Sequence, residues 1–263
     1  MNEKYNSLKE YIRSLGSVAV AFSGGVDSTF LLKTAHDVLR EGAIAITEQT
    51  DVFPERERED ASEFCKREGI EQIILKSDVL GIEGFAENPK DRCYLCKRTL
   101  FRDIKQKTAQ MGIAYVCEGS NVDDDGDYRP GMKAVAELDI KSPLKHAGLT
   151  KSEIRELSRE LGLSTWDKPS FACLASRFVY GEQITKEKLR MVECAERLLL
   201  DEGFTQLRVR VHGTMARIEI APDEFEKMIG VAKKVNKGMR TLGFTYVALD
   251  LGGYKTGNMN VGI

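Results

Sequence analysis

The first half of the chain alternates between short apolar stretches and longer amphipathic ones. Short unbroken apolar runs are typical of strands buried on both faces, and the longer stretches have the apolar spacing of helices. Strands and helices in this alternation form a parallel sheet that is covered on both sides, so we expect an α/β fold. The expected strands are Val18–Phe22, Ala43–Thr47, Gln72–Leu75 and Tyr115–Glu118, and the expected helices are Thr29–Arg40, Arg56–Glu68 and Lys97–Met111.

A glycine-rich loop, Ser23-Gly24-Gly25-Val26-Asp27-Ser28, joins the first expected strand to its helix. The N–H groups of such a loop and of the helix N-terminus bind phosphate. Its glycines let the backbone approach a pyrophosphate, its serines add hydroxyl donors, and Asp27 can hold Mg²⁺ against the phosphates. The lysine of a Walker loop is absent, which excludes a kinase or GTPase cradle. An ordinary strand–turn–helix corner with serine caps is the alternative.

The loop resembles the PP-loop of ATP pyrophosphatases, enzymes that cut ATP between its α and β phosphates. This resemblance implies that ATP and Mg²⁺ are bound by Ser23, Gly24, Gly25, Asp27 and Ser28. Ligands of parallel sheets bind at the carboxyl ends of the strands. We therefore add two strand-end residues to the expected nucleotide site, Thr47 and Gly119.

Composition excludes several classes of protein. The chain has 263 residues, 42% hydrophobic and 30% charged, as in a soluble globular protein. A formal net charge of −2 argues against nucleic acid as a partner, and no apolar run is long enough to span a membrane. Residues Met1–Tyr5 lack the apolar core of a signal peptide, so we expect a cytoplasmic protein whose six cysteines are thiols.

The second half of the chain changes character. A capping box, Thr150 with Glu153, begins a helix that runs to Gly162, and the aperiodic segment Ser164–Gly181 follows. We expect a PP-loop domain over residues 1–170 and a smaller α+β domain over residues 171–263 for substrate binding or oligomerisation. The elements expected in the smaller domain are a helix Thr185–Glu202, a hairpin of Gln206–His212 and Met215–Ile220 joined through Gly213, a helix Pro222–Lys237 and a strand Phe244–Leu249.

Cys93 and Cys96 have the spacing of metal or iron–sulfur ligands. No second C-x-x-C and no nearby histidine completes a structural zinc site. A redox dithiol is the alternative, although that motif usually opens a helix in a thioredoxin-like unit. Cys173, in the aperiodic segment and beside Arg177, is the candidate third thiol. The remaining three thiols are expected to be small buried hydrophobes: Cys65, Cys117 and Cys194.

Two further patterns carry charge. One face of an expected strand carries every second residue: Arg208, Arg210 and His212. Two guanidinium groups side by side there would bind a phosphate, and a solvated polar face is the alternative. Glu219 on the next strand is expected in a salt bridge or a metal site. Counted from Asn121, the segment that contains the run Asp123–Asp127 begins like an EF-hand loop but has Met132 at the twelfth position, so a solvated acidic loop is expected.

Together these stretches resemble the LarE family, the ATP-dependent sulfur transferases that supply sulfur to the nickel-pincer nucleotide cofactor of lactate racemase. The resemblance covers nearly the whole chain. Its most specific part is the segment from Trp166 to Ser176. It also rests on Ser23–Ser28, Cys93–Lys97, Glu118–Asn121 with Tyr128–Gly131, and Ser142–Leu144.

The resemblance implies a mechanism. ATP adenylates a carboxylate of pyridinium-3,5-biscarboxylic acid mononucleotide, and a sulfur nucleophile displaces AMP to give a thiocarboxylate. In one branch of the family the residue matching Cys173 gives up its own sulfur; that branch lacks the pair matching Cys93 and Cys96. This chain is similar to the three-cysteine branch, in which a 4Fe-4S cluster on the three thiols carries sulfur from a sulfide donor. The implied catalytic residues are Cys173, Asp27 and Lys97, the implied phosphate ligands are Arg208 and Arg210, and the family suggests a homo-oligomer.

Three other functions are alternatives to sulfur transfer. A PP-loop tRNA thiolase with a three-cysteine cluster is the nearest, but the chain has a slight negative charge and no dedicated RNA-binding domain. An amidotransferase-coupled ligase, such as an NAD or GMP synthetase, leaves the three cysteines unexplained. A non-enzymatic nucleotide-binding module leaves Asp27 and Cys173 unexplained.

Overall fold

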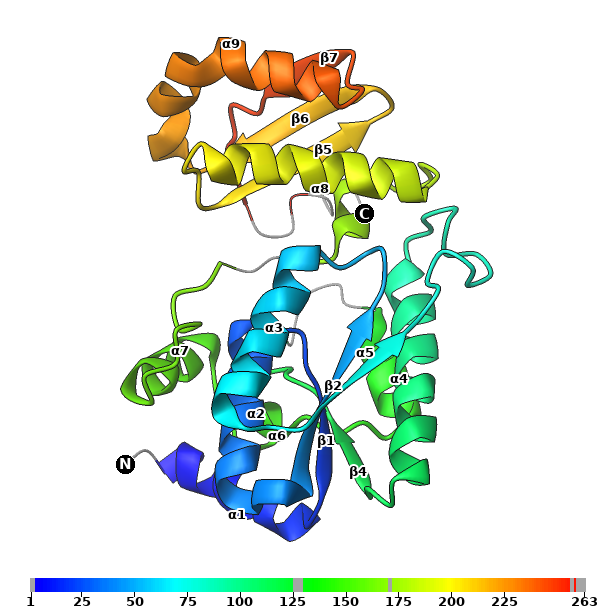
Figure 1. Cartoon of the computed structure of the whole chain (residues 1–263), viewed down its shortest axis with the longest axis vertical. Helices are drawn as coiled ribbons and strands as arrows, with labels where there is room; N and C mark the ends of the chain where they lie inside the picture. Colours follow the sequence, from blue (N-terminus) through cyan, green and yellow to red (C-terminus); the bar gives the residue numbers. More distant parts are fainter. Residues whose placement is uncertain (1–2, 125–129, 170–171, 256–257, 259–263) are drawn as a thin grey trace. The chain divides into compact units, whose positions relative to one another are not determined.

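The computed structural model describes residues 3–124, 130–169, 172–255 and 258. The chain forms two compact units, one of Met1–Asp78 with Asp91–Phe171 and the other of Val79–Lys90 with Ala172–Ile263 (Figure 1). The expected division at residue 170 did not place Val79–Lys90 with the second unit. Its association with that unit is carried by Asn88, whose side-chain amide donates to the carbonyl oxygens of Phe178 and Val179 at 3.3 and 2.6 Å.

The first unit is built on a four-stranded sheet in the order β3-β2-β1-β4. Every neighbouring pair is parallel, and Val18 of β1 lies beside Ala43 of β2 and Tyr115 of β4. The expected α/β class with a parallel sheet is therefore confirmed. The strands are β1 (Val18–Ala21), β2 (Ala43–Gln49), β3 (Gln72–Lys76) and β4 (Tyr115–Cys117), each within two residues of its expected bounds.

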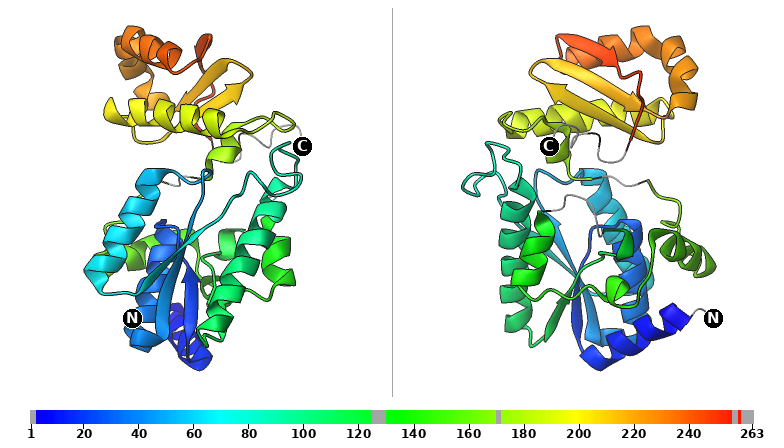
Figure 2. Two further views of the ribbon diagram at one scale, coloured as in Figure 1. Left: turned by 45° about the vertical axis from the view of Figure 1, so that its right-hand side comes forward. Right: turned by 180° about the vertical axis from the view of Figure 1, so that it is seen from behind.

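Helices cover both faces of this sheet (Figures 1 and 2). On one face α2 (Val26–Leu39) and α3 (Glu55–Glu68) bury a core that includes Val20 and Phe30. On the other, α4 (Arg92–Gln110) and α5 (Gly131–Glu137) pack around Ile44 and Ile46. The unit is completed by α1 (Glu3–Leu15), α6 (Pro143–His146) and α7 (Lys151–Glu160), the last beginning with the expected capping box.

Helix α4 begins five residues earlier than its apolar spacing predicts. Its N-cap residue, Asp91, makes no side-chain capping bond, so the usual capping interaction does not mark the start. The early start places Cys93 and Cys96 in the opening turns of a helix. The C-x-x-C pair thus has the helical setting of a redox dithiol, but it lies beside a sheet whose first strand leads into the PP-loop.

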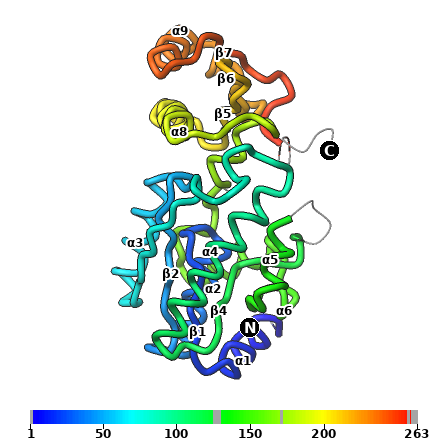
Figure 3. The backbone as a smooth tube through the Cα atoms, turned by 90° about the vertical axis from the view of Figure 1, so that its right-hand side faces the viewer, coloured from blue at the N-terminus to red at the C-terminus, as the bar shows by residue number. Residues whose placement is uncertain are grey.

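The second unit has a three-stranded sheet in the order β5-β6-β7, with α8 and α9 on one side of it (Figure 3). The expected hairpin of β5 (Leu207–His212) and β6 (Met215–Ile220) is present, and Gly213 in its turn has φ +60°. β7 (Tyr246–Leu249) pairs parallel to β6. The helices are α8 (Lys186–Asp201) and α9 (Phe225–Thr241), the latter preceded by a 3₁₀ turn at Pro222–Glu224.

Among the helices that the structure describes, none combines the length and the apolar character needed to cross a membrane.

Candidate active site

The PP-loop, Ser23–Ser28, lies at the carboxyl end of β1 and runs directly into α2. Gly24 has φ +72°, and a Cβ at this position would lie 3.1 Å from the carbonyl oxygen of Glu57, so backbone conformation and space both require glycine. The Ser28 hydroxyl donates to the Gly25 carbonyl at 3.2 Å and lies 3.1 Å from the Ser23 hydroxyl. Because Gly25 is the N-cap and has no side chain, the first N–H groups of α2 are left available to an anion.

Asp27, on the first turn of α2, meets a lysine that the sequence did not single out. The Lys151 ammonium lies 2.5 Å from Asp27 Oδ2, and the Asn121 side-chain amide donates to Asp27 Oδ1 at 3.4 Å. Lys151 is the first residue of α7, where its backbone N–H donates to Asp123 Oδ2 at 2.7 Å. The only sequence signal for Lys151 was the capping box at Thr150, which fixes the start of the helix but not the lysine's partner.

The segment after β4 lies against the same helix turn. A Cβ on Gly119 would lie 3.1 Å from the Ser28 amide nitrogen and 3.2 Å from Asp27 Cβ, so a larger residue would press on the PP-loop. The buried Glu118 carboxylate accepts hydrogen bonds from the hydroxyls of Ser120 and Ser142 at 2.7 and 2.5 Å. Two stretches that carried the family resemblance, Glu118–Asn121 and Ser142–Leu144, therefore meet beside the PP-loop.

Thr47 and Glu48 lie near the carboxyl end of β2, beside the strand that leads into the PP-loop. The Thr47 hydroxyl donates to the Phe22 carbonyl at 3.0 Å and accepts from Gln72 Nε2 at 2.9 Å, so it braces the strand end from which the PP-loop starts. Its contact with ATP stays a prediction. Burial raises the pKa of Glu48 to about 7, although a hydrogen bond from Ser77 at 2.6 Å opposes this. At neutral pH this carboxyl therefore carries only part of a full negative charge.

The segment Cys93–Lys97 packs against the start of α5. A Cβ on Gly131 would lie 2.7 Å from Cδ of Lys97 and 3.4 Å from the Cys93 carbonyl oxygen, so glycine makes room for the lysine stem. Cys93 is exposed and Cys96 is 8% exposed. Tyr128 and Arg129, which also carried the resemblance, lie outside the described residues, as do Ser170 and Phe171.

Cys173, in the second unit, is held by a fully buried arginine, Arg177. The Arg177 guanidinium donates to the carbonyl oxygens of Ala172 and Cys173 at 2.5 and 3.1 Å. Its other nitrogens donate to the two carboxylate oxygens of Glu196 at 2.8 and 2.9 Å. Although burial raises the pKa of Glu196, its ion pair with Arg177 outweighs burial and lowers that pKa overall. The backbone of Cys173 is thus fixed from inside while its side chain stays partly exposed.

Arg208 and Arg210 share one face of β5, as the period-two pattern predicted. They are only 3% and 5% exposed, so the alternative of a solvated polar face is wrong. Arg210 donates to Glu219 at 2.9 Å and to the Ser176 carbonyl at 2.9 Å, and Arg217 lies 3.2 Å from Glu219. Glu219 is therefore in a salt bridge, one of the two roles that the sequence left open.

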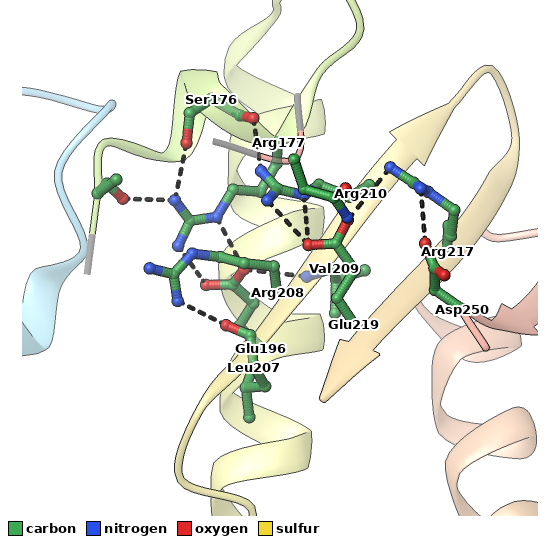
Figure 4. Close-up of polar contacts among 12 residues, drawn as sticks. Ser176, Arg177, Glu196, Leu207, Arg208, Val209, Arg210, Arg217, Glu219 and Asp250 are labelled. Atoms are coloured by element: carbon green, nitrogen blue, oxygen red, sulfur yellow. Dashed lines mark hydrogen bonds and ion pairs between the residues drawn. The ribbon is translucent and has the colours of Figure 1, made fainter. Parts of the chain in front are cut away.

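Arg208 belongs to a largely buried network of charged side chains. Among the residues that the structure describes, the network contains four arginines and the carboxylates of Glu196, Glu219 and Asp250 (Figure 4). Arg208 donates to the Leu207 carbonyl at 2.6 Å and lies 5.0 Å from the Tyr254 ring. Burial and the neighbouring charge of Arg177 lower the pKa of Arg208 to about 10. An anion bound at this face would relieve that repulsion.

The three remaining cysteines and the acidic run Asp123–Asp127 agree only in part with what the sequence predicted. Cys65 and Cys117 are buried, as expected, and burial raises the pKa of each thiol to about 12, whereas Cys194 on α8 is only partly buried. Asp123 is not simply solvated, because it accepts the Lys151 N–H; Asp125–Asp127 lie outside the described residues.

Comparison with known proteins identifies the family. No family model matches the chain. An uncharacterized protein of Synechocystis sp. is 38% identical over 99% of this chain and 98% of its own length. The pyridinium-3,5-bisthiocarboxylic acid mononucleotide synthase of Lactiplantibacillus plantarum is 36% identical over 98% of this chain and 94% of its own length. The tRNA-specific 2-thiouridylase MnmA of Heliobacterium modesticaldum is more distant, with 28% identity over 58% of this chain and 50% of its own length.

These relationships bear on both the fold and the family. The parallel sheet, its glycine loop and the distant thiouridylase agree with the PP-loop ATP pyrophosphatase class expected from the sequence. The match to the Lactiplantibacillus synthase extends over both units, whereas the thiouridylase matches little more than half of the chain. The chain therefore belongs to the LarE family, that of the pyridinium-3,5-bisthiocarboxylic acid mononucleotide synthase.

Proposed function

We propose that this protein is an ATP-dependent sulfur transferase that converts the carboxylates of pyridinium-3,5-biscarboxylic acid mononucleotide to thiocarboxylates. The observation that carries the proposal is the meeting of Asp27, Lys151 and a glycine loop at the carboxyl edge of the sheet, in a member of this family. In the first step, a substrate carboxylate oxygen attacks the α-phosphorus of ATP and pyrophosphate leaves. In the second, hydrosulfide attacks the acyl carbon and the bond to AMP breaks.

The first step is assigned to the PP-loop and the residues around Asp27. The N–H groups at the start of α2 receive the phosphates, and the Asp27 carboxylate has the oxygen donors that Mg²⁺ prefers. When the metal accompanies ATP, the Lys151 ammonium, now 2.5 Å from Asp27, is placed to contact the phosphates instead. Mg²⁺ held by Asp27 would neutralise the charge on the leaving pyrophosphate. Lys97 is assigned to the substrate, because its stem is fixed against Gly131 at the start of α5.

Sulfur delivery is assigned to Cys93, Cys96 and Cys173. Among the described residues no three metal-ligating side chains are grouped, and these thiols belong to different units. Their chemistry fits an iron–sulfur cluster, because all three are cysteines outside any disulfide and Cys93 and Cys96 have ligand spacing. These three thiolates would hold the cluster, and the chemistry it would supply is sulfide for attack on the acyl-adenylate.

The experiment that tests the function is direct. Anaerobically purified protein is incubated with MgATP, sulfide and pyridinium-3,5-biscarboxylic acid mononucleotide, and pyrophosphate and product mass are measured. We expect pyrophosphate release that requires the dicarboxylate, and a product in which sulfur replaces oxygen. Release of pyrophosphate with tRNA and not with the mononucleotide would replace this proposal with a tRNA thiolase.

Replacing Arg208 with alanine tests the phosphate site of the substrate nucleotide. Because Arg208 and Arg210 lie buried on one face of β5 and can bind a phosphate together, loss of Arg208 should weaken binding of the mononucleotide by about 1.5–3 kcal/mol, roughly ten- to a hundredfold. Steady-state kinetics should show a raised KM for the mononucleotide with the KM for ATP nearly unchanged. An equal loss for ATP would assign Arg208 to the adenylate instead. Arg190→Ala, which removes an exposed arginine on α8 of the same unit, is the matched control.

A further inference from the structure

Lys168 joins the segment Trp166–Ser176 to the PP-loop. Its ammonium lies 3.3 Å from the carbonyl oxygen of Gly24 and 2.9 Å from the carboxylate oxygens of both Glu57 and Asp60 on α3. The side chain is only 13% exposed, so these contacts are made largely away from solvent. One lysine thus bridges a helix and the loop that receives phosphate, and the mechanism above gives it no role.

The backbone around Lys168 is itself fixed. Arg155 of α7 donates from one guanidinium nitrogen to the Trp166 carbonyl at 2.5 Å and from another to the Lys168 carbonyl at 2.9 Å. Pro169 follows and removes a further degree of backbone freedom. Lys168 therefore reaches the PP-loop from a segment whose own position is set by α7, the helix that also supplies Lys151.

The Gly24 carbonyl controls the direction of a phosphate-binding group. In a planar trans peptide the C=O and the following N–H point in opposite directions. With the Gly24 oxygen held toward Lys168, the Gly25 N–H points away from the lysine. Gly24 has φ +72°, a conformation open to glycine, and glycine's freedom means that this peptide needs an external contact to hold one orientation.

Lys168 also neutralises two carboxylates beside the loop, those of Glu57 and Asp60. Glu57 is 14% exposed, and burial raises its pKa, while the hydrogen bond and charge of Lys168 oppose that shift. Without the lysine, Glu57 and Asp60 would face the PP-loop uncompensated, next to the site proposed for a polyanion. Loss of Lys168 can therefore act through orientation or through charge, and the two causes must be separated.

We propose that Lys168 is a positioning residue for ATP: it holds the Gly24 carbonyl so that the Gly25 N–H faces the bound phosphates. The proposal rests on the assignment of ATP to the PP-loop and not on the identity of the sulfur acceptor. It adds a reason for a lysine within the Trp166–Ser176 segment, because the chain that continues to Cys173 is anchored on the nucleotide loop five residues earlier.

Lys168→Gln is compared with Lys33→Gln, a matched control. Lys33 also bridges two carboxylates, those of Asp37 and Glu68 at 2.6 and 3.7 Å, and is 22% exposed, but these two ion pairs lie away from the loop. Titration calorimetry of the full chain with MgATP should give a dissociation constant about tenfold higher for Lys168→Gln, equivalent to about 1.4 kcal/mol, and unchanged for Lys33→Gln. The thermal midpoints of the two variants should match. ATP affinity at the wild-type level in Lys168→Gln, or an equal loss in Lys33→Gln, overturns the proposal.

The double variant Lys168→Gln/Glu57→Gln separates orientation from charge. If the lysine orients the Gly24 peptide, ATP affinity stays about tenfold weaker in the double variant; recovery to the wild-type affinity shows charge compensation alone and overturns the proposal. Kinetics should show the KM for ATP raised more than kcat is lowered.

One measurement needs no variant. Hydrogen exchange at the Gly25 amide of the wild-type chain should slow when ATP is added, and an unchanged rate overturns the proposal. If MgATP binds but adding the pyridinium dicarboxylate causes no release of pyrophosphate from ATP, the proposed substrate is wrong. The ATP-binding measurements would still decide the role of Lys168.

Discussion

Asp27→Ala is expected to reduce pyrophosphate release by roughly 10²-fold or more, without unfolding the protein. The Asp27 carboxylate is 24% exposed at the first turn of α2, faces the Lys151 ammonium at 2.5 Å, and is the carboxylate of the PP-loop itself. Its loss removes the proposed oxygen ligand of Mg²⁺ where charge develops on the leaving group. The measurement is pyrophosphate release with saturating ATP and mononucleotide, with the far-ultraviolet spectrum and thermal midpoint recorded for each variant.

The matched control is Asp37→Ala on the same helix. Asp37 is also paired with a lysine, Lys33, at 2.6 Å and is 35% exposed, but it lies near the opposite end of α2 from the PP-loop. We expect the control to retain the wild-type rate. If Asp27→Ala also retains it, the assignment of Asp27 to ATP cleavage is wrong.

The parts of the site that follow from local sequence were predictable. Strand β1 is an apolar run, Gly24 and Gly25 mark the turn, and the alternation of Arg208 with Arg210 places both on one face of β5. These features depend on residues close together in the chain, whose backbone periods determine which side chains share a face. The hairpin at Gly213 and the capping box at Thr150 are of the same kind.

The parts that depend on contacts distant in sequence were not predictable. Lys151 reaches Asp27 across 124 residues, and Lys168 reaches Gly24 across 144. In the sequence both lysines have the appearance of ordinary surface residues. The burial of Arg208 could not be predicted either. The apolar–polar alternation of Leu207 and Arg208 is typical of a strand with one exposed face, and Tyr254, which covers Arg208, comes from a distant segment. The start of α4 was missed for a different reason, since Asp91 makes no side-chain cap.

Cys93→Ala, Cys96→Ala and Cys173→Ala are each expected to lower the iron content of anaerobically purified protein and to abolish thiocarboxylate formation. Each thiol is one of only three protein ligands in the proposed site, so one substitution leaves too few to hold a cluster. Pyrophosphate release should persist, because Asp27 and the PP-loop are unchanged. Iron analysis, the visible absorption spectrum and product mass measure the three effects separately.

The matched control is Cys194→Ala, because Cys194 is a free, partly buried thiol in the same unit as Cys173. Cys65→Ala and Cys117→Ala extend the control to buried thiols, whose raised pKa values make thiolate ligation unfavourable. All three controls should keep the iron content and sulfur transfer of the wild type. Loss of iron in a control variant alone would assign the cluster to different thiols.

The protein mass after turnover separates the two possible sources of sulfur. If a cluster carries sulfide, the mass of the polypeptide is unchanged after several turnovers, because Cys173 keeps its Sγ atom. If Cys173 is itself the donor, its Cβ–Sγ bond breaks, and the chain loses the mass of one H₂S for each thiocarboxylate formed. Arg177 holds the Cys173 backbone in either case, so its contacts favour neither route. A loss of one H₂S at Cys173 would therefore refute the cluster as sulfur carrier and leave ATP cleavage at the PP-loop intact.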